Sequence, residues 1–217
     1  MLFRSDERSP RLERSSSSFD QRHRWVTSAV LQTPYKRGES GFVRKFLADF
    51  TLAPIVEVSS GRPFTVLTGS DINVNLASNT DRPSIASSGG VTSPFISGVT
   101  FVPANICDVA VQIPPAPVPI PPAQSISPPV GCTGNLGRNT FTRPGFFTFD
   151  LRVARKIHFG ERWNLELIAD MFNLFNRFNV GDVSPLCNPL DPANCRAGEP
   201  TAALDVRQFQ FAVKINW

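Results

Sequence analysis

The sequence contains no run of about 18 apolar residues, the length that a bilayer-spanning helix needs. Residues 1–24, MLFRSDERSPRLERSSSSFDQRHR, also lack the apolar h-region of a secretory signal peptide. The net charge is only +4, from 22 Lys and Arg against 18 Asp and Glu. No basic patch alternates with aromatic residues, so nucleic-acid binding is not expected.

Residues suited to catalysis are few and scattered. The two histidines, His23 and His158, lie far apart, and neither is beside a Ser or Cys in a nucleophile motif. The glycines between Gly131 and Gly137 are not followed by the Lys-Ser/Thr of a phosphate-binding loop. No acid, base and nucleophile come together as a catalytic site requires. We therefore expect no enzyme activity and no cofactor.

Four cysteines are present, and their separations fit no C-x-x-C zinc or redox pattern. This spacing predicts no metal site. The cysteines fall as two pairs in two separate loop-like segments, which favours loop disulfides in an oxidising compartment over free thiols. The residues concerned are Cys107, Cys132, Cys187 and Cys195.

Strict alternation is the strongest pattern in the sequence. In GFFTFDLRVARKIHFGERWNLELIADMFNLFNRFN, which begins at Gly145, most side chains at every second position from Phe147 onward are apolar. The pattern breaks at residues 160–162 and resumes at Trp163. A period of two predicts two strands, each with one apolar and one polar face.

The expected hairpin opposes charges of opposite sign. With the turn at residues 160–162, Phe159 faces Trp163, and a one-residue slip would mix the two faces. Arg152 then meets Asp170, and Lys156 meets Glu166, pairs that support an antiparallel ladder. We expect the polar face to line a barrel lumen through Asp150, Arg152, Lys156, Glu166 and Asp170.

The length of these strands favours a membrane protein. Strands of soluble sheets run about 5–6 residues, whereas a strand that crosses a bilayer needs about 9–11. Transmembrane barrels also carry aromatic girdles at both interfaces. Here Phe159 and Trp163 lie at the turn. The aromatic residues at the opposite end are Phe146, Phe147, Phe172, Phe175 and Phe178.

Two further segments and the C-terminus continue the strand pattern. Strands are expected at residues 24–35, 46–59 and 206–217, besides the hairpin, and Pro54 interrupts the second. A strand tolerates proline only at an edge, a bulge or a bend. The connections alternate between short and long, at residues 36–45, 60–145, 160–162 and 176–205.

Alternating connection lengths are typical of outer-membrane barrels, which have short periplasmic turns and long extracellular loops. With the C-terminus in the periplasm, both short connections fall on the periplasmic side and both cysteine pairs outside. We therefore predict an all-β fold, an antiparallel transmembrane β-barrel fragment of about five long strands, located in the outer membrane.

The domain organisation follows from these strands. Residues 1–23 are expected to be a disordered extracellular loop remnant, and residues 24–217 the C-terminal strands of the barrel. Within loop 60–145, the proline-rich stretch Val111–Val130 predicts a stiff polyproline II spacer.

Arg155 conflicts with this pattern, because it falls among the apolar positions. An Arg on the lipid face at mid-depth costs about 2–4 kcal/mol. Two explanations are open: the side chain snorkels to the periplasmic interface, or a bulge near Ala154 turns it inward.

The stretch GNLGRNTFTRPGFFTFDLRVARKIHFGERWNLELIADMFNLFNRFN resembles the C-terminal barrel strands of TonB-dependent outer-membrane receptors, in particular the Oar-like group. SFDQRHRWVTSAVLQTP and VEVSSGRPFTVLTG look like earlier strands of such barrels. The terminal FAVKINW is similar to their C-terminal insertion signal, here carried by Phe211, Val213, Ile215 and Trp217. The barrel assembly machinery reads that signal in the family, where the last residue is more usually Phe.

The resemblance implies energised uptake of an unidentified ligand. Family members have a 22-stranded barrel with an N-terminal plug, and the inner-membrane TonB complex delivers the energy. This sequence lacks the plug and the TonB-contacting segment, and five strands cannot close a barrel around a channel. We expect it to be the C-terminal part of a longer receptor, not transport-competent alone. Its expected partners are outer-membrane lipid, the assembly machinery, the rest of the receptor (plug and N-terminal strands), and the TonB complex through that plug.

Two alternatives stay open from the sequence. One is a secreted or cell-surface β-sandwich that serves as a binding or adhesion module. The other is a small pore, in which several copies of the chain close one barrel.

Overall fold

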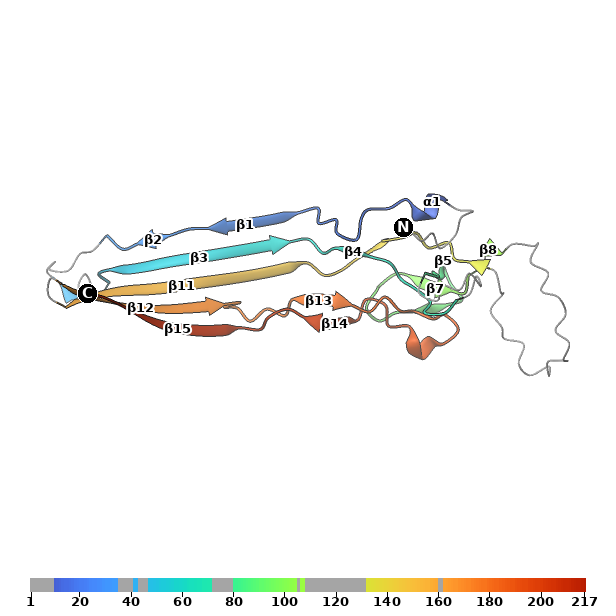
Figure 1. The fold of residues 1–217 in the computed structure, drawn as a ribbon. Helices are drawn as coiled ribbons and strands as arrows, with labels where there is room; N and C mark the ends of the chain where they lie inside the picture. The colour runs from blue at the N-terminus through green and yellow to red at the C-terminus, as the bar shows by residue number, and fades with distance from the viewer. Residues whose placement is uncertain are drawn as a thin grey trace. The chain divides into compact units, whose positions relative to one another are not determined.

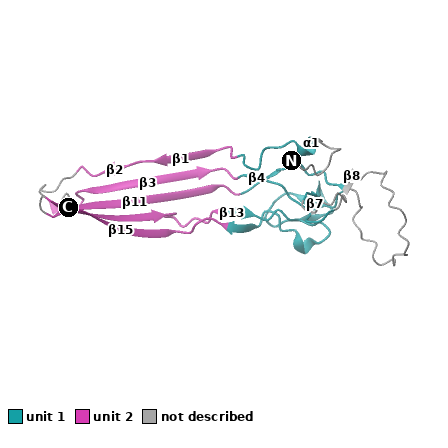
Figure 2. Ribbon diagram, viewed as in Figure 1, with its two compact units in different colours: residues 1–20, 62–143, 181–202 teal, residues 21–61, 144–180, 203–217 magenta. Residues whose placement is uncertain are grey.

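The computed structural model describes residues 10–34, 41–42, 47–71, 80–104, 106–107, 132–159 and 162–217. The chain divides into two compact units, shown in different colours in Figure 2. Unit 1 contains residues 1–20, 62–143 and 181–202, and unit 2 contains residues 21–61, 144–180 and 203–217.

Unit 2 is an antiparallel sheet of long strands (Figure 1). The strands follow the order β1-β3-β11-β12-β15, and β2 pairs with β3 beside β1. Their bounds are Arg24–Ser28 (β1), Leu31–Gln32 (β2), Phe50–Ser59 (β3), Phe146–Phe159 (β11), Trp163–Phe172 (β12) and Gln208–Asn216 (β15). The antiparallel, all-β prediction is confirmed, and each strand lies beside the next long strand along the chain.

The predicted hairpin register is confirmed. Strand β11 runs for 14 residues, and Phe159 pairs with Trp163 at its end. Both expected charge pairs, Arg152 with Asp170 and Lys156 with Glu166, occupy opposed ladder positions. Register follows from the period of two, because any odd slip would place apolar side chains on the polar face.

Pro54 lies inside a central strand, where we had expected an edge, a bulge or a bend. It pairs with Leu151 of β11 in an unbroken ladder. Its carbonyl accepts a hydrogen bond from the Ala29 N–H (3.2 Å), so its missing donor also faces β1. Residues 29–30, opposite this position, separate β1 from β2. The neighbouring strand is thus interrupted where proline cannot donate.

The strand ends differ from prediction by a few residues. Strand β3 begins at Phe50 instead of residue 46, after Asp49 with a φ of +60°. A positive φ takes the backbone out of the β region, so the strand cannot extend through Asp49. Strand β15 covers residues 208–216 of the expected 206–217.

Unit 1 is built from the segments that the sequence marked as loops. Its elements are short: α1 (Pro10–Glu13), β4 (Pro63–Phe64), β5 (Ser84–Ala86), β6 (Val91–Thr92), β7 (Thr100–Val102), β8 (Ile106–Cys107), β9 (Cys132–Thr133), β10 (Phe141–Thr142) and η2 (Pro192–Asn194). Strands β13 (Val180–Val183) and β14 (Pro200–Ala203) pair with each other. Phe101, Leu136 and Val66 are fully buried, so the expected loops share a small core of their own.

Residues 10–20 correct the expectation of a disordered N-terminal remnant. The carboxylate of Glu13 pairs with the buried guanidinium of Arg82 at 2.5 Å. The Leu12 carbonyl accepts a hydrogen bond from the Arg138 N–H (2.9 Å). These contacts fix the segment, because a buried charge needs its partner.

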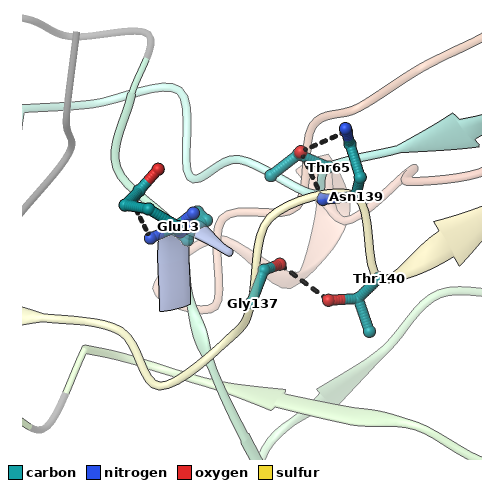
Figure 3. Close-up of polar contacts among 6 residues, drawn as sticks. Glu13, Thr65, Gly137, Asn139 and Thr140 are labelled. Carbon is teal, nitrogen blue, oxygen red and sulfur yellow. Dashed lines mark hydrogen bonds and ion pairs between the residues drawn. The ribbon is translucent and has the colours of Figure 1, made fainter. Parts of the chain in front are cut away.

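Side-chain hydrogen bonds hold the chain between β9 and β10. The Asn139 N–H donates to Thr65 Oγ1 (2.8 Å), and the Thr140 hydroxyl donates to the Gly137 carbonyl (2.7 Å) (Figure 3). Asn139 has a φ of +51°, a conformation that Asn tolerates better than most residues.

Several predicted features lie outside the described residues. These are the proline-rich stretch Val111–Val130, Gly160 and Glu161 of the hairpin turn, and most of the connection at residues 36–45. Within the part of the chain that is described, no helix is long and apolar enough to cross a bilayer.

Candidate functional site

One face of the unit 2 sheet is apolar across five strands. The registers place odd-numbered residues of β1, β11, β12 and β15 on the same face as even-numbered residues of β3. Thr27 and Arg155 are the exceptions at these positions, and the other positions carry large apolar side chains, Pro54 or Ala169. The members of this apolar face on the last two strands are Trp163, Leu165, Leu167, Ala169, Met171, Phe209, Phe211, Val213 and Ile215.

The apolar face is open to the surroundings at its C-terminal strand. Phe211 is 78% exposed, Val213 is 62% exposed, and Trp217 just beyond the strand is 86% exposed. A soluble protein covers a contiguous apolar surface of this kind. In a transmembrane barrel the outward side of each strand is apolar because it contacts lipid.

Aromatic residues mark both ends of the apolar face. At the hairpin-turn end, the rings of Trp163 and Trp217 lie 6.2 Å apart. At the other end, the Phe175 ring lies 6.4 Å from that of Phe147 and 5.1 Å from that of Phe149. This is the arrangement of the two aromatic girdles of outer-membrane barrels.

The distance between these aromatic rows fits a bilayer. From Phe147 to Phe159 there are 159 − 147 = 12 residue steps within β11. At a rise of about 3.3 Å per residue this is about 40 Å along the strand. A tilt of about 45° reduces it to about 28 Å, close to the apolar band of about 25 Å in such barrels.

Arg155 remains on the apolar face. Both ladders of β11 are continuous through Ala154, so the bulge hypothesis is wrong. The guanidinium lies over the ring of Phe50, 5.0 Å from its centroid, in a cation–π contact. Phe50 is the first residue of β3, at the hairpin-turn end of the sheet.

The opposite, polar face carries the residues that we expected to line the lumen. Asp150, Arg152 and Lys156 share it on β11, as do Glu166 and Asp170 on β12. Arg152 holds Asp170 in a two-pronged contact, Nε to Oδ1 at 2.6 Å and Nη2 to Oδ2 at 2.8 Å. Glu166 lies in register between Lys156 and, on β15, Lys214.

Asp150 has a structural role that the sequence analysis did not specify. Its Oδ1 accepts hydrogen bonds from the Thr148 hydroxyl (2.9 Å) and from the Asn173 N–H (2.8 Å). It therefore holds the start of the loop that follows β12. Asn173 and Asn176 in this loop have φ values of +46° and +50°, which suit Asn.

Two buried asparagines complete the loop, and sequence reasoning missed both. Asn173, 5% exposed, donates to the carbonyls of Arg177 (2.9 Å) and Asp205 (3.1 Å). Asn179, 3% exposed, bonds both backbone polar groups of Phe147. The signal present in the sequence was the group of three asparagines in NLFNRFN, because Asn favours turns and tolerates a positive φ.

A cavity of about 370 Å³ opens on the polar face at this end of the sheet. Strands β11, β12 and β15 contribute to it through polar-face positions such as Thr148, Phe172 and Gln208. The loop before β15 forms a further wall of the cavity with Leu204, Asp205 and Val206. Asp150 lines it as well, but the other expected lumen residues do not.

Cysteines and histidines take no part in this cavity. Cys187 and Cys195 form a disulfide, and the backbones of Cys107 and Cys132 are opposed in the β8–β9 ladder. His23 joins a loop network in which its N–H donates to Ser60 Oγ (3.1 Å) and its carbonyl accepts from the Ser60 N–H (2.8 Å). Among the described residues, no three His, Cys, Asp or Glu side chains gather to hold a metal.

The residues of the expected insertion signal lie on strand β15 and just after it. Phe211, Val213 and Ile215 alternate on the apolar face, and Trp217 follows the end of the strand. Among the described strands, β15 pairs only with β12.

Comparison with known proteins agrees with this geometry. The family model described as the outer membrane beta barrel domain matches residues 2–210. No curated protein and no solved structure matches the chain. The match covers nearly the whole chain and places it in the outer membrane. The chain belongs to the outer membrane beta-barrel domain family.

Proposed function

We propose that this chain forms part of the barrel wall of a TonB-dependent-type receptor that takes up a ligand across the outer membrane. The observation that carries the proposal is the six-stranded sheet with one apolar face, an opposite charged face and aromatic rows at both ends. We propose a role in binding and transport, without a catalytic step.

The wall is proposed to be completed by further strands. Within the described part of the chain, β1 and β15 each pair along one side only. Unpaired backbone groups in hydrocarbon cost several kcal/mol each, so a sheet in lipid must close. The remainder of a receptor would supply the missing strands and the plug, and this chain would not transport alone.

The connections support a receptor with large outer loops. The segments of unit 1 precede β1, follow β3, precede β11, follow β12 and precede β15. In an antiparallel sheet with these registers, all of them leave the same end. Long loops of outer-membrane barrels are extracellular, so the long connections at residues 60–145 and 176–205 are proposed to be extracellular and to offer the first contact with ligand.

Three partners follow from this proposal. Lipid contacts the apolar face, and the barrel assembly machinery reads the alternating apolar residues of β15. The TonB complex acts through the plug of the complete receptor.

The proposal is tested with an antibody to the C-terminal peptide on outer-membrane fractions, boiled and unboiled. We expect a band well above the 23.8 kDa of this chain, with a mobility that shifts on boiling. The detergent-solubilised protein should also be retained by the immobilised periplasmic domain of TonB, and a variant receptor without its TonB-contacting segment serves as control.

Other outcomes would favour the alternatives. A 23.8 kDa band in the soluble fraction contradicts the receptor and supports a secreted β-sandwich module. A detergent-resistant oligomer of 23.8 kDa subunits supports a self-assembled pore. If the protein shifts on boiling but is not retained by TonB, the proposal of energised uptake is contradicted and the barrel assignment stands.

A further inference from the structure

We propose that the cavity on the polar face is a binding subsite for a small organic cation with an apolar body, such as an arylalkyl ammonium ion. The inference deepens the proposed function, on which it rests, because it gives the ligand class for one position on the lumen wall. Four independent features of the described residues carry it: size, apolar walls, charge and the use of the amides.

The size of the cavity suits a small molecule. Its volume of about 370 Å³ lies within the range of about 300–1,000 Å³ for ligand pockets. The ends of three paired strands form its floor, so much of the site is held by the sheet. The loop before β15 is tied to the loop that follows β12, because Asn173 donates to the Asp205 carbonyl (3.1 Å) and the Leu204 N–H donates to the Asn179 carbonyl (2.9 Å).

Apolar side chains supply most of the walls. Phe146 and Phe172 lie at polar-face positions of β11 and β12, where alternation would place polar residues. Leu204 and Val206 enter from the loop. Aromatic rings next to aliphatic side chains accommodate a flat or alkyl group, and aromatic faces also attract cations.

The charge of the cavity is negative. Asp150 and Asp205 both line it, and no Lys or Arg is among its described lining residues. The basic residues of the same loops are engaged elsewhere. The guanidinium of Arg177 lies over Phe147 and that of Arg207 over Phe209, both rings on the apolar side of the sheet. Two carboxylates without a lining cation favour a positively charged ligand.

Two of the three amides that line the cavity, those of Asn173 and Asn179, are already used within the protein, which leaves few neutral groups for a polyol. The side-chain oxygen and NH₂ of Asn179 both bond the backbone of Phe147. The NH₂ of Asn173 donates to the carbonyls of Arg177 and Asp205, and its side-chain oxygen accepts from the Arg177 N–H. Recognition of hydroxyl groups depends on such donors and acceptors being available. Besides the Gln208 amide, the carboxylates are the groups that can select a ligand, and Asp205 is foremost because Asp150 Oδ1 already accepts two hydrogen bonds.

The test is calorimetric titration of the protein purified from outer membranes in detergent. Three probes of similar shape are used: phenethylammonium, 2-phenylethanol and 3-phenylpropionate. We expect the ammonium ion to bind at least about tenfold more tightly than the alcohol, and the carboxylate to show no binding. Equal binding of all three, or preference for the alcohol or the carboxylate, would overturn the inference.

A matched pair of variants locates the binding. Asp205→Asn should weaken phenethylammonium binding by about tenfold, because Asp205 lines the cavity. Asp182→Asn removes the same charge from unit 1, where Asp182 pairs with Arg143, and should leave affinity unchanged. Equal effects of the two substitutions would place the ion elsewhere and overturn the assignment.

The inference and the proposed function fail separately. Each variant is first checked for the mobility shift on boiling, which reports an intact barrel, and for retention by TonB. If wild-type protein keeps both properties and binds no phenethylammonium, the cation subsite is wrong and the receptor stands. If TonB retention is absent while the ion binds with the expected preference, the subsite stands and energised uptake is wrong.

Discussion

The side-chain amide of Asn179 pairs with both backbone polar groups of Phe147. The Phe147 N–H donates to Oδ1 at 3.0 Å, and the Phe147 carbonyl accepts from Nδ2 at 2.8 Å. The β11–β12 ladder extends only from Leu151 to Phe159 on the β11 side. Asn179 thus acts as a side-chain substitute for the strand partner that Phe147 lacks there.

Replacing Asn179 with Ala should destabilise this end of the sheet. The variant leaves a donor and an acceptor of Phe147 without these partners, at a cost of about 1–3 kcal/mol. The effect is measured as the temperature at which heating converts the unboiled electrophoretic band into the boiled one. Asn176→Ala is the control, because within the described residues the Asn176 side chain accepts a single, longer bond from the Arg207 N–H (3.3 Å). Similar losses for both variants would contradict the substitute role.

Removal of the Cys187–Cys195 disulfide should affect unit 1 and spare the sheet. The bond closes a short loop, with a sequence separation of 8, and the chain-entropy model gives about 2–3 kcal/mol for such a loop. The Cys187→Ser, Cys195→Ser double variant should be cleaved faster by protease within residues 181–202, while its mobility shift on boiling is retained. Loss of the shift would show that barrel and unit 1 fold as one.

The Glu13–Arg82 pair should stabilise unit 1 strongly. Both side chains are mostly buried, at 14% and 4% exposure. Removing one partner of a buried pair costs about 3–5 kcal/mol because a charge is left uncompensated. Glu13→Gln should therefore expose residues 10–20 to protease. Glu57→Gln is the control, since its partner Arg24 is 59% exposed and exposed pairs contribute about 0–1 kcal/mol. Equal protease sensitivity of the two variants would contradict this ranking.

An Arg scan of adjacent positions tests the two faces of β12. Leu167 lies on the apolar face, and Ile168 lies on the polar face between Glu166 and Asp170. Leu167→Arg should reduce barrel stability, because Arg on the lipid face costs up to about 2–4 kcal/mol at the midplane and because Leu167 pairs with Arg155, so that like charges would be directly opposed. Ile168→Arg should be tolerated, because its charge faces two carboxylates. The stabilities of the two variants are compared by heat-modifiable electrophoresis of outer-membrane fractions. A greater loss of stability for Ile168→Arg than for Leu167→Arg would mean that the two faces are assigned the wrong way round.

Alternation made the sheet predictable, and non-local side-chain contacts made unit 1 unpredictable. The hairpin register followed from the period of two and from the Arg152–Asp170 pair, both readable within 30 residues. Unit 1 has strands of two to four residues and depends on bonds such as Ser93 Oγ to the Ala197 carbonyl (2.5 Å), 104 residues apart. Strands so short leave no periodic signal.

The candidate cavity was only partly predictable for a similar reason. Asp150 was expected on the lumen face, and the structure places it there. Asp205 and Leu204 reach the cavity through a loop whose path depends on Asn173 and Asn179. Side chains that bond distant backbone groups give no pattern in a single sequence.

The most direct test of the account is a nitroxide scan of β12, residues 163–172, in outer-membrane preparations. The labels are introduced one at a time by amber suppression, which leaves the cysteines unchanged. We expect collisions with oxygen, which partitions into lipid, to peak at odd positions, and collisions with a water-soluble nickel chelate to peak at even positions. An accessibility profile without the period of two, or with low oxygen accessibility throughout, would contradict a lipid-facing sheet.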